Sequence, residues 1–235
     1  MMDLQGQFLI AMPQLEDYFQ NTVVYMCEHN EQGSMGLVIN QPTDLSIAEL
    51  YSKMNFMMKN DRTFSNELVL AGGPVHSERG FILHKKTAKE FEHSYKITDD
   101  MYLTTSADIV ETFGSVDAPE KYLVALGCAS WTAGQLEQEI ADNAWLVAPV
   151  SDTILFETIY EDRYPAANQL SGINPHNFVF SQVGHSQWAS RQSHLILAQK
   201  ALVVRSGKVS RVQRKPYLHL KRKMGFQTGM PLRNA

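Results

Sequence analysis

Cysteine is scarce in this chain. Among 235 residues only Cys27 and Cys128 occur, and they form no CxxC motif. Two isolated cysteines exclude the disulfide framework of a small secreted domain. The N-terminal segment has no basic stretch, and its apolar run over residues 8–12 is too short to cross a membrane. We therefore expect a protein of the reducing cytoplasm, without a signal peptide or membrane anchor.

Sequence motifs of the commonest enzyme classes are also missing. The chain contains no phosphate-binding loop, no GxGxxG, no GxSxG and no HExxH. Their absence is weak evidence against the commonest enzyme classes.

Acidic residues are absent from the last fifth of the chain. Residues 187–235 hold 11 Lys and Arg and no Asp or Glu, whereas residues 1–186 hold ten Lys and Arg against 25 Asp and Glu. The two segments thus carry charges of +11 and −15. Because an acidic body repels phosphate groups, residues 1–186 are not expected to bind DNA directly.

Hydrophobic patterning predicts a series of short strands mixed with about four helices. The expected strands are at residues 7–12, 22–29, 35–40, 67–71, 80–84, 95–97, 101–105, 121–126, 145–150 and 178–183. Helices are expected near residues 47–58, 108–113, 132–142 and 153–160, and hairpins over 22–40 and 67–84. This mixture favours an α+β fold with one domain at 1–186 and a basic tail at 187–235 that is either disordered or not native.

The stretch from Gly127 to Trp145 has the most local structure signals. We expect a strand, a tight turn, a helix and a strand. Thr132 and Gln135 have capping-box spacing, Trp131 and Leu136 have hydrophobic-staple spacing, and Asn143 is expected to end the helix.

Two groups of residues are candidates for binding. The backbone N–H groups of the loop formed by Gly72, Gly73 and Pro74, in which only the glycines have an N–H, can cradle an anion, although a hairpin turn explains the same residues. His29 and His84 each end an expected strand. They can act as paired ligands or as acid and base, but hydrogen-bonded structural histidines are the simpler interpretation.

Other candidates have stronger structural explanations. Cys128 before a helix N-terminus can be a nucleophile if a histidine lies nearby, but a buried, inert cysteine is the favoured interpretation. Glu137 and Glu139 do not share a helix face, so a solvated helix face is favoured there over a paired-carboxylate site. The methionines near Met54 form either a partner-binding surface or, more simply, core.

A set of short segments matches one known family in order along the chain: residues 6–13, 28–29, 36–42, 72–75, 80–84, 127–131 and 134–137, followed by Glu139, Asn143 and Trp145. Through these segments the sequence resembles the AlgH/YqgE family of small bacterial proteins, whose members carry the label of transcriptional regulator. One departure is that the family usually reads Gly-Tyr-Ala-Gly-Trp where this chain has Cys128 and Ser130.

The resemblance implies a single compact domain with a branched mixed sheet, partly closed as a small barrel and surrounded by helices. It implies no catalytic residue, no metal and no cofactor. Within its motifs, Asn40, Trp131 and Gln135 join the candidate ligand-binding residues.

The tail suggests a different origin. With permitted codons, a one-base shift beginning in the codon of Gln187 yields a start that resembles the YqgF/RuvX-type Holliday-junction-resolvase-like nucleases. We hypothesise that residues 187–235 are an out-of-frame reading of an overlapping gene. The nuclease is then a candidate protein partner.

Three functions follow. The first is a non-catalytic binding or regulatory protein that acts through a protein partner. The second is a small-molecule-binding protein or hydrolase that uses the Gly72–Val75 loop with His84, which requires these residues to share a pocket. The third is a DNA-binding transcriptional regulator, which would depend on the basic tail.

Overall fold

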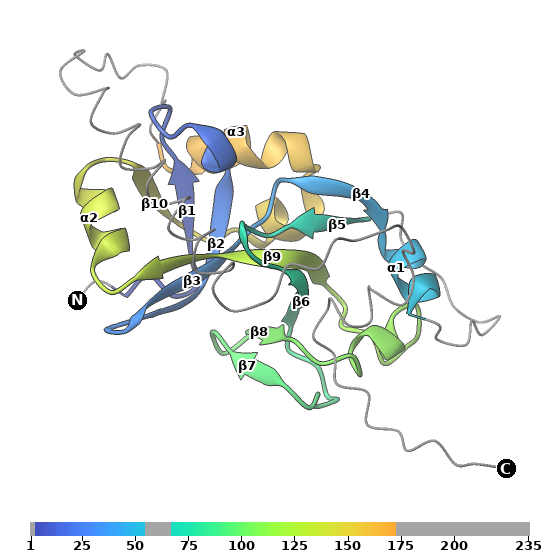
Figure 1. Ribbon diagram of the computed structural model, residues 1–235. Coiled ribbons are helices and arrows are strands. Elements are labelled where there is room, and N and C mark those ends of the chain that lie inside the picture. Colours follow the sequence, from blue (N-terminus) through green and yellow to red (C-terminus); the bar gives the residue numbers. More distant parts are fainter. Residues whose placement is uncertain (1–2, 55–66, 173–235) are drawn as a thin grey trace, which may run out of the picture.

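The computed structural model describes residues 3–54 and 67–172 (Figure 1). The strands within these ranges are β1 (Gln7–Ala11), β2 (Val23–Asn30), β3 (Gly33–Val38), β4 (Pro42–Ser46), β5 (Leu68–Ala71), β6 (Val75–Lys85), β7 (Ser94–Lys96), β8 (Met101–Thr104), β9 (Tyr122–Thr132) and β10 (Trp145–Pro149). The helices there are α1 (Ile47–Lys53), α2 (Gln135–Ala141) and α3 (Tyr160–Leu170), the 3₁₀ turns η1 (Asp17–Phe19) and η2 (Val110–Thr112), and the π-helix η3 (Thr153–Glu157).

The strands form one sheet that branches at β9. The main path runs β10-β1-β2-β3-β9-β6-β8-β7, and the pair β5-β4 leaves it at β9. β5 is parallel to β9, with Leu70 opposite Ala125, while the pairs along the main path are antiparallel. The sheet curls into a half-barrel, with α2 at one end and α1 at the other (Figure 1). The expected sheet-rich α+β architecture is confirmed.

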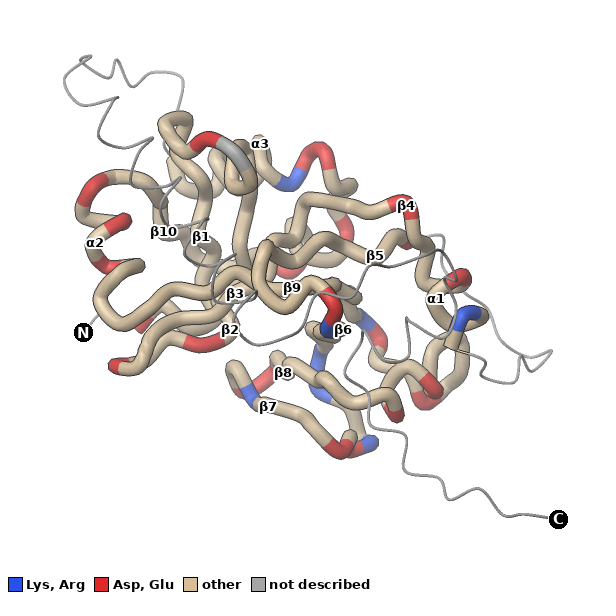
Figure 2. The backbone as a smooth tube through the Cα atoms, viewed as in Figure 1, with Lys and Arg blue, Asp and Glu red and all other residues tan. Residues whose placement is uncertain are grey.

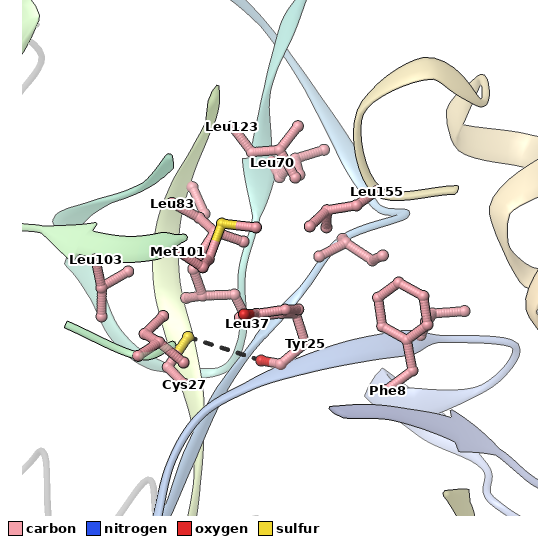
Figure 3. Packing of buried hydrophobic residues seen from close by; sticks show 14 of the residues in the cluster. Phe8, Tyr25, Cys27, Leu37, Leu70, Leu83, Met101, Leu103, Leu123 and Leu155 are labelled. Carbon is pink, nitrogen blue, oxygen red and sulfur yellow. Dashed lines mark hydrogen bonds between the residues drawn. The ribbon is translucent and has the colours of Figure 1, made fainter. Parts of the chain in front are cut away.

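Alternation along the inner strands explains why apolar residues dominate them. On β1, Phe8 and Ile10 enter one buried cluster, whereas Leu9 and Ala11 enter another. Successive side chains point to opposite faces of a strand, so a strand buried on both faces is apolar throughout. Figure 3 shows the first cluster, in which Phe8, Tyr25 and Cys27 lie inside the curl of the sheet.

Glycines allow the sheet to branch. β3 and β5 lie along the same edge of β9, and Gly72 joins them by donating to the Leu126 carbonyl and accepting from the Val38 N–H, each at 2.8 Å. A Cβ on Gly73 would lie 2.0 Å from the Cys128 carbonyl carbon, and one on Gly127 would lie 2.5 Å from the Gly73 oxygen. Only glycine permits backbones to approach this closely.

The predicted hairpin over residues 67–84 is wrong. β5 pairs with β4 and β9, and β6 pairs with β8 and β9, so β5 and β6 are not partners. The chain does turn at Gly72-Gly73-Pro74, but the turn carries it from β5 on one edge of β9 to β6 on the other edge. Sequence analysis also missed β4, which begins at Pro42. Proline is tolerated at the first position of a strand and at a sheet edge.

The helix predictions were confirmed in part. Ser46 and Glu49 form the expected capping box, but α1 ends at Lys53, and residues 55–58 of the predicted helix lie outside the described residues. So do the predicted strand at 178–183 and the basic tail. The predicted 153–160 helix is the shorter η3, and α3 was missed because it contains Pro165.

Side-chain hydrogen bonds from two residues of α3 fix the helix to the chain around it. Buried Arg163 donates from Nε to the Thr158 carbonyl at 2.9 Å and from Nη1 to the Ile39 carbonyl. Tyr164 donates to the Ala11 carbonyl at 2.8 Å. These side-chain hydrogen bonds, two of them to distant strands, offset the one helical hydrogen bond that a proline removes.

Candidate partner-binding surface

The stretch that begins at Gly127 has the predicted order of strand, turn, helix and strand, with the turn at Ala133 and Gly134. β9 continues to Thr132, and α2 starts only at Gln135 after Gly134, whose φ is 75°. The Gln135 carboxamide accepts from the Thr132 N–H at 3.0 Å, which is half of the predicted capping box. Asn143, with a φ of 59°, follows the helix as expected.

Two tryptophans of this stretch share one carboxylate. Trp131 and Trp145 donate their indole N–H groups to Glu139 Oε2 at 2.9 and 2.8 Å. Gln135 donates to Glu139 Oε1 at 2.9 Å. The rings of Trp131 and Trp145 meet edge to face, and Phe19 stacks beside Trp131. Candidates Trp131 and Gln135 therefore already have internal partners, which anchor α2 to the sheet.

His29 lies beneath α2 in a less complete environment. Its Nδ1 shares a 2.8 Å hydrogen bond with Ser34 Oγ on the neighbouring strand. Its side chain is only 2% exposed, yet Nε2 has no hydrogen-bond partner. The nearest charged group is Glu137 Oε1, at 3.6 Å on a side chain that is 40% exposed.

His84 is fully satisfied at the other end of the sheet. Nδ1 donates to the Lys85 carbonyl and Nε2 accepts from Thr104 Oγ1, both at 2.8 Å. The ring packs between Phe91 and Tyr102. Burial lowers the pKa of His84, so the neutral ring persists at neutral pH. These contacts describe a structural histidine.

The predicted loop and Asn40 are also engaged in the fold. The Gly72 N–H already bonds to Leu126, and Gly73 lies against the backbone of Cys128. The Asn40 side chain accepts from the Val23 N–H at 2.8 Å and donates to the Asn21 carbonyl at 2.9 Å. Both ends of its amide thus hold the start of β2.

The candidate residues do not converge on one site. His84 lies opposite Tyr122, and the Gly72–Pro74 loop lies against Cys128. Tyr122 and Cys128 are six residues apart on β9, a separation of about 20 Å along the strand. His29 pairs with Ser34, which faces β9 beyond Cys128. The structure therefore brings His29 near Trp131 and Gln135, but keeps His84 and the glycine loop apart from them.

Neither cysteine is placed for reaction. Cys27 and Cys128 are free and buried, and β3 separates their strands. Burial raises the pKa of the Cys128 thiol to about 11 and also raises that of Cys27. Cys128 lies inside β9 and not before a helix N-terminus, so the alternative of a helix-stabilised thiolate is wrong and the favoured interpretation of a buried cysteine is confirmed.

A pocket of about 650 Å³ has none of these residues on its lining, although the lining includes Tyr122, the strand partner of His84. Its lining includes Glu67, Glu120 and Glu157, one lysine, and the rings of Tyr122 and Phe156. Sequence reasoning missed it because its walls come from three separate segments and contain no motif. Its aromatic walls and net negative lining are suited to an organic cation.

Charge is distributed unevenly over the described residues. We define the acidic lobe as residues 3–40 and 127–151, which comprise β1, β2, β3, the end of β9, α2 and β10. The lobe contains eight Asp and Glu and no Lys or Arg, whereas residues 75–104, the β6–β8 arm, contain five of each sign. In Figure 2 the tube around α2 and the β2–β3 tip is marked in red and tan only.

The comparisons with known proteins agree on one family. The model of the AlgH-like family matches residues 8–176. The chain belongs to the AlgH-like family. A UPF0301 protein of Haemophilus influenzae is 75% identical over 186 residues, which are 79% of this chain and 100% of the relative. A UPF0301 protein of Pasteurella multocida is 69% identical with the same coverage.

Solved structures support the same AlgH-like assignment. The solution structure of the AlgH protein from Pseudomonas aeruginosa is 39% identical and matches with a TM-score of 0.62, covering 77% of this chain and 95% of that one. A crystal structure of a Corynebacterium diphtheriae protein, 18% identical with a TM-score of 0.55, shares the fold over 72% of this chain and 88% of its own. The resemblance seen in the sequence is thus confirmed, and the family carries no assigned activity to transfer.

Within the described ranges, no helix combines the length and the apolar character that a membrane-spanning helix requires.

Proposed function

We propose that this AlgH-like protein is a non-catalytic binding protein that acts through a protein partner with a basic surface. The observation that carries the proposal is the absence of Lys and Arg from the acidic lobe. Over all described residues, 24 Asp and Glu stand against eight Lys and Arg. Such a field attracts and orients a positively charged protein and repels nucleic acid.

The hydrogen bonds of the residues that carry the family resemblance support the same proposal. Trp131, Trp145, Gln135 and Glu139 bond to one another, and Asn40 bonds to backbone. Side chains that satisfy one another hold a fold in shape and are poorly placed to perform chemistry. A rigid scaffold with a charged surface is a typical binding module.

The partner we propose is the YqgF/RuvX-type resolvase-like nuclease, because the tail suggests that its gene overlaps this one. A nuclease that binds DNA needs a basic face, which complements the acidic lobe. The length aligned to the relatives, 186 residues, equals that of the acidic segment 1–186 and is consistent with a tail outside the family domain.

The test is a titration of the nuclease with the full chain and with a chain that ends at Ser186, at low and at physiological salt. We expect binding by both chains that weakens as salt rises. No binding at low salt would contradict the proposal. Binding by the full chain alone would assign the interaction to the tail and also contradict it.

A second candidate function is the binding of a small organic cation in the pocket beside Tyr122 and Phe156. Its support is the pocket itself, with three glutamates on its lining. Calorimetry with spermidine separates the two functions, because the polyamine should bind without the nuclease and lose affinity in Glu120→Gln.

A further inference from the structure

The outer surface of α2 is acidic, and its inner surface is fixed. Leu136 is fully buried beneath the helix, and Glu139 is held by the two indoles. Glu137 and Asp142 point outward, Glu137 with 40% of its side chain exposed. A binding partner can therefore reach these carboxylates without unfolding the helix.

His29 provides an independent sign of a ligand at this surface. Its Nε2 is buried, has no hydrogen-bond partner and faces Glu137 Oε1 at 3.6 Å. When Nδ1–H donates to Ser34 Oγ, Nε2 is an acceptor that faces another acceptor. An unsatisfied buried nitrogen costs about 1–3 kcal/mol, so a donor placed between the two atoms is favourable.

The donor that fits is the cationic end of a side chain. A nitrogen of an ammonium or guanidinium can lie about 2.9 Å from both Nε2 and Oε1 once the flexible Glu137 side chain rotates. A metal ion fits less well, because the described residues contain no group of three or more His, Cys, Asp and Glu able to hold one. An anion is excluded by the charge of the lobe.

We propose that α2 and the adjoining β2–β3 hairpin form the docking surface for a lysine- or arginine-rich segment of the partner protein, with one cationic side chain donating to both Glu137 and His29. This location rests on the proposed function. The surrounding lobe contains eight acids, of which Glu139 is held by the two indoles, and no Lys or Arg that would compete with such a segment. The β6–β8 arm, with equal numbers of both signs, offers no such preference.

The experiment is an NMR titration of the isotope-labelled full chain with an oligolysine peptide. We expect the largest amide shifts in residues 29–34 and 135–142, and a shift of the His29 ring nitrogen signals. Shifts that centre on the β6–β8 arm, or that leave the His29 ring unchanged, would overturn the proposed surface.

Matched charge variants separate this surface from general attraction. The double variant Glu137→Gln/Asp142→Asn removes two charges from α2, and Glu161→Gln/Asp162→Asn removes two exposed charges from α3. We expect about tenfold weaker peptide binding from the first pair and less than about twofold from the second. His29→Leu, which keeps every acid, should weaken binding about threefold. Equal effects from the two pairs would contradict the proposal.

The nuclease titration keeps the two proposals apart. If the nuclease binds the native chain and the Glu137→Gln/Asp142→Asn chain equally, the function stands and the α2 surface fails. If the nuclease does not bind but the peptide still docks at α2 with the expected variant effects, the surface stands and the proposed partner is wrong.

Discussion

The two ends of the sheet contain similar histidines in different environments. His29 and His84 both lie at strand ends, and both side chains are almost completely buried. At the β6–β8 end, His84 uses both ring nitrogens, and the charges around it are balanced. At the acidic lobe, His29 uses one nitrogen and turns the other toward a carboxylate.

The difference shows that burial does not identify a functional residue. A buried polar group with all of its partners stabilises the fold, whereas one that lacks a partner marks a place where something else can bind. The glycine fork at Gly72, Gly73 and Gly127 lies between these two ends and holds both in one sheet.

The largest effect is expected at that fork. Gly73→Ala places a Cβ 2.0 Å from the Cys128 carbonyl carbon at a φ of 157°, so the free energy of unfolding should fall by at least about 3 kcal/mol. Gly134→Ala is the control, because its φ of 75° is also positive but no atom lies within 4 Å of the new Cβ. It should lose only about 1 kcal/mol. Urea unfolding measures both, and similar losses would refute a crowded fork.

The next largest effect is the difference in stability loss between variants of the two histidines. His84→Leu leaves the Lys85 carbonyl without its imidazole donor and removes one of the two partners of Thr104 Oγ1, which keeps Ser94, so it should cost about 2–3 kcal/mol. His29→Leu removes the hydrogen-bond partner of Ser34 alone and also removes an unsatisfied nitrogen. The free energy of unfolding should therefore fall by only about 0–1 kcal/mol. The same denaturation measurement compares them, and a larger loss for His29→Leu would reverse the comparison.

The smallest effect is a change in pH dependence. The folded state lowers the pKa of His84 below its ordinary 6.5, mainly by burial, so the unfolded chain binds more protons as the pH falls. The stability from neutral His84 is complete above 6.5 and decreases as the pH falls toward the folded value. His84→Gln should flatten this decrease below pH 6.5. An unchanged slope in unfolding experiments would show that other groups cause it.

Local patterns predicted what depends on near neighbours. The capping box of Ser46 with Glu49 and the position of Asn143 after α2 both involve residues a few positions apart, and both are confirmed. The β2–β3 hairpin was also correct, because its turn and its strands are contiguous. Patterns failed where the partner is distant, as in the 67–84 hairpin, whose strands pair elsewhere, and in α3, where Pro165 is tolerated.

The candidate site was predictable only in part. His29, Trp131 and Gln135 were identified from strand ends and motifs, and they do lie near one another. Glu137 was dismissed because it does not share a helix face with Glu139, which is a rule for contacts within one helix. Its contact is with His29, more than a hundred residues away in the sequence, and no periodicity reports such a pair.

The amino-acid sequence by itself determined the family, the separation of acidic and basic segments, and most strand positions, because each depends on residue identity or short-range pattern. The tertiary structure alone decided which histidine is satisfied, why three glycines are needed at one fork, and where the cation-free segments gather. Those outcomes depend on backbones and side chains that meet across β9 from distant parts of the chain, and their hydrogen bonds and contacts exist only once the sheet has curled.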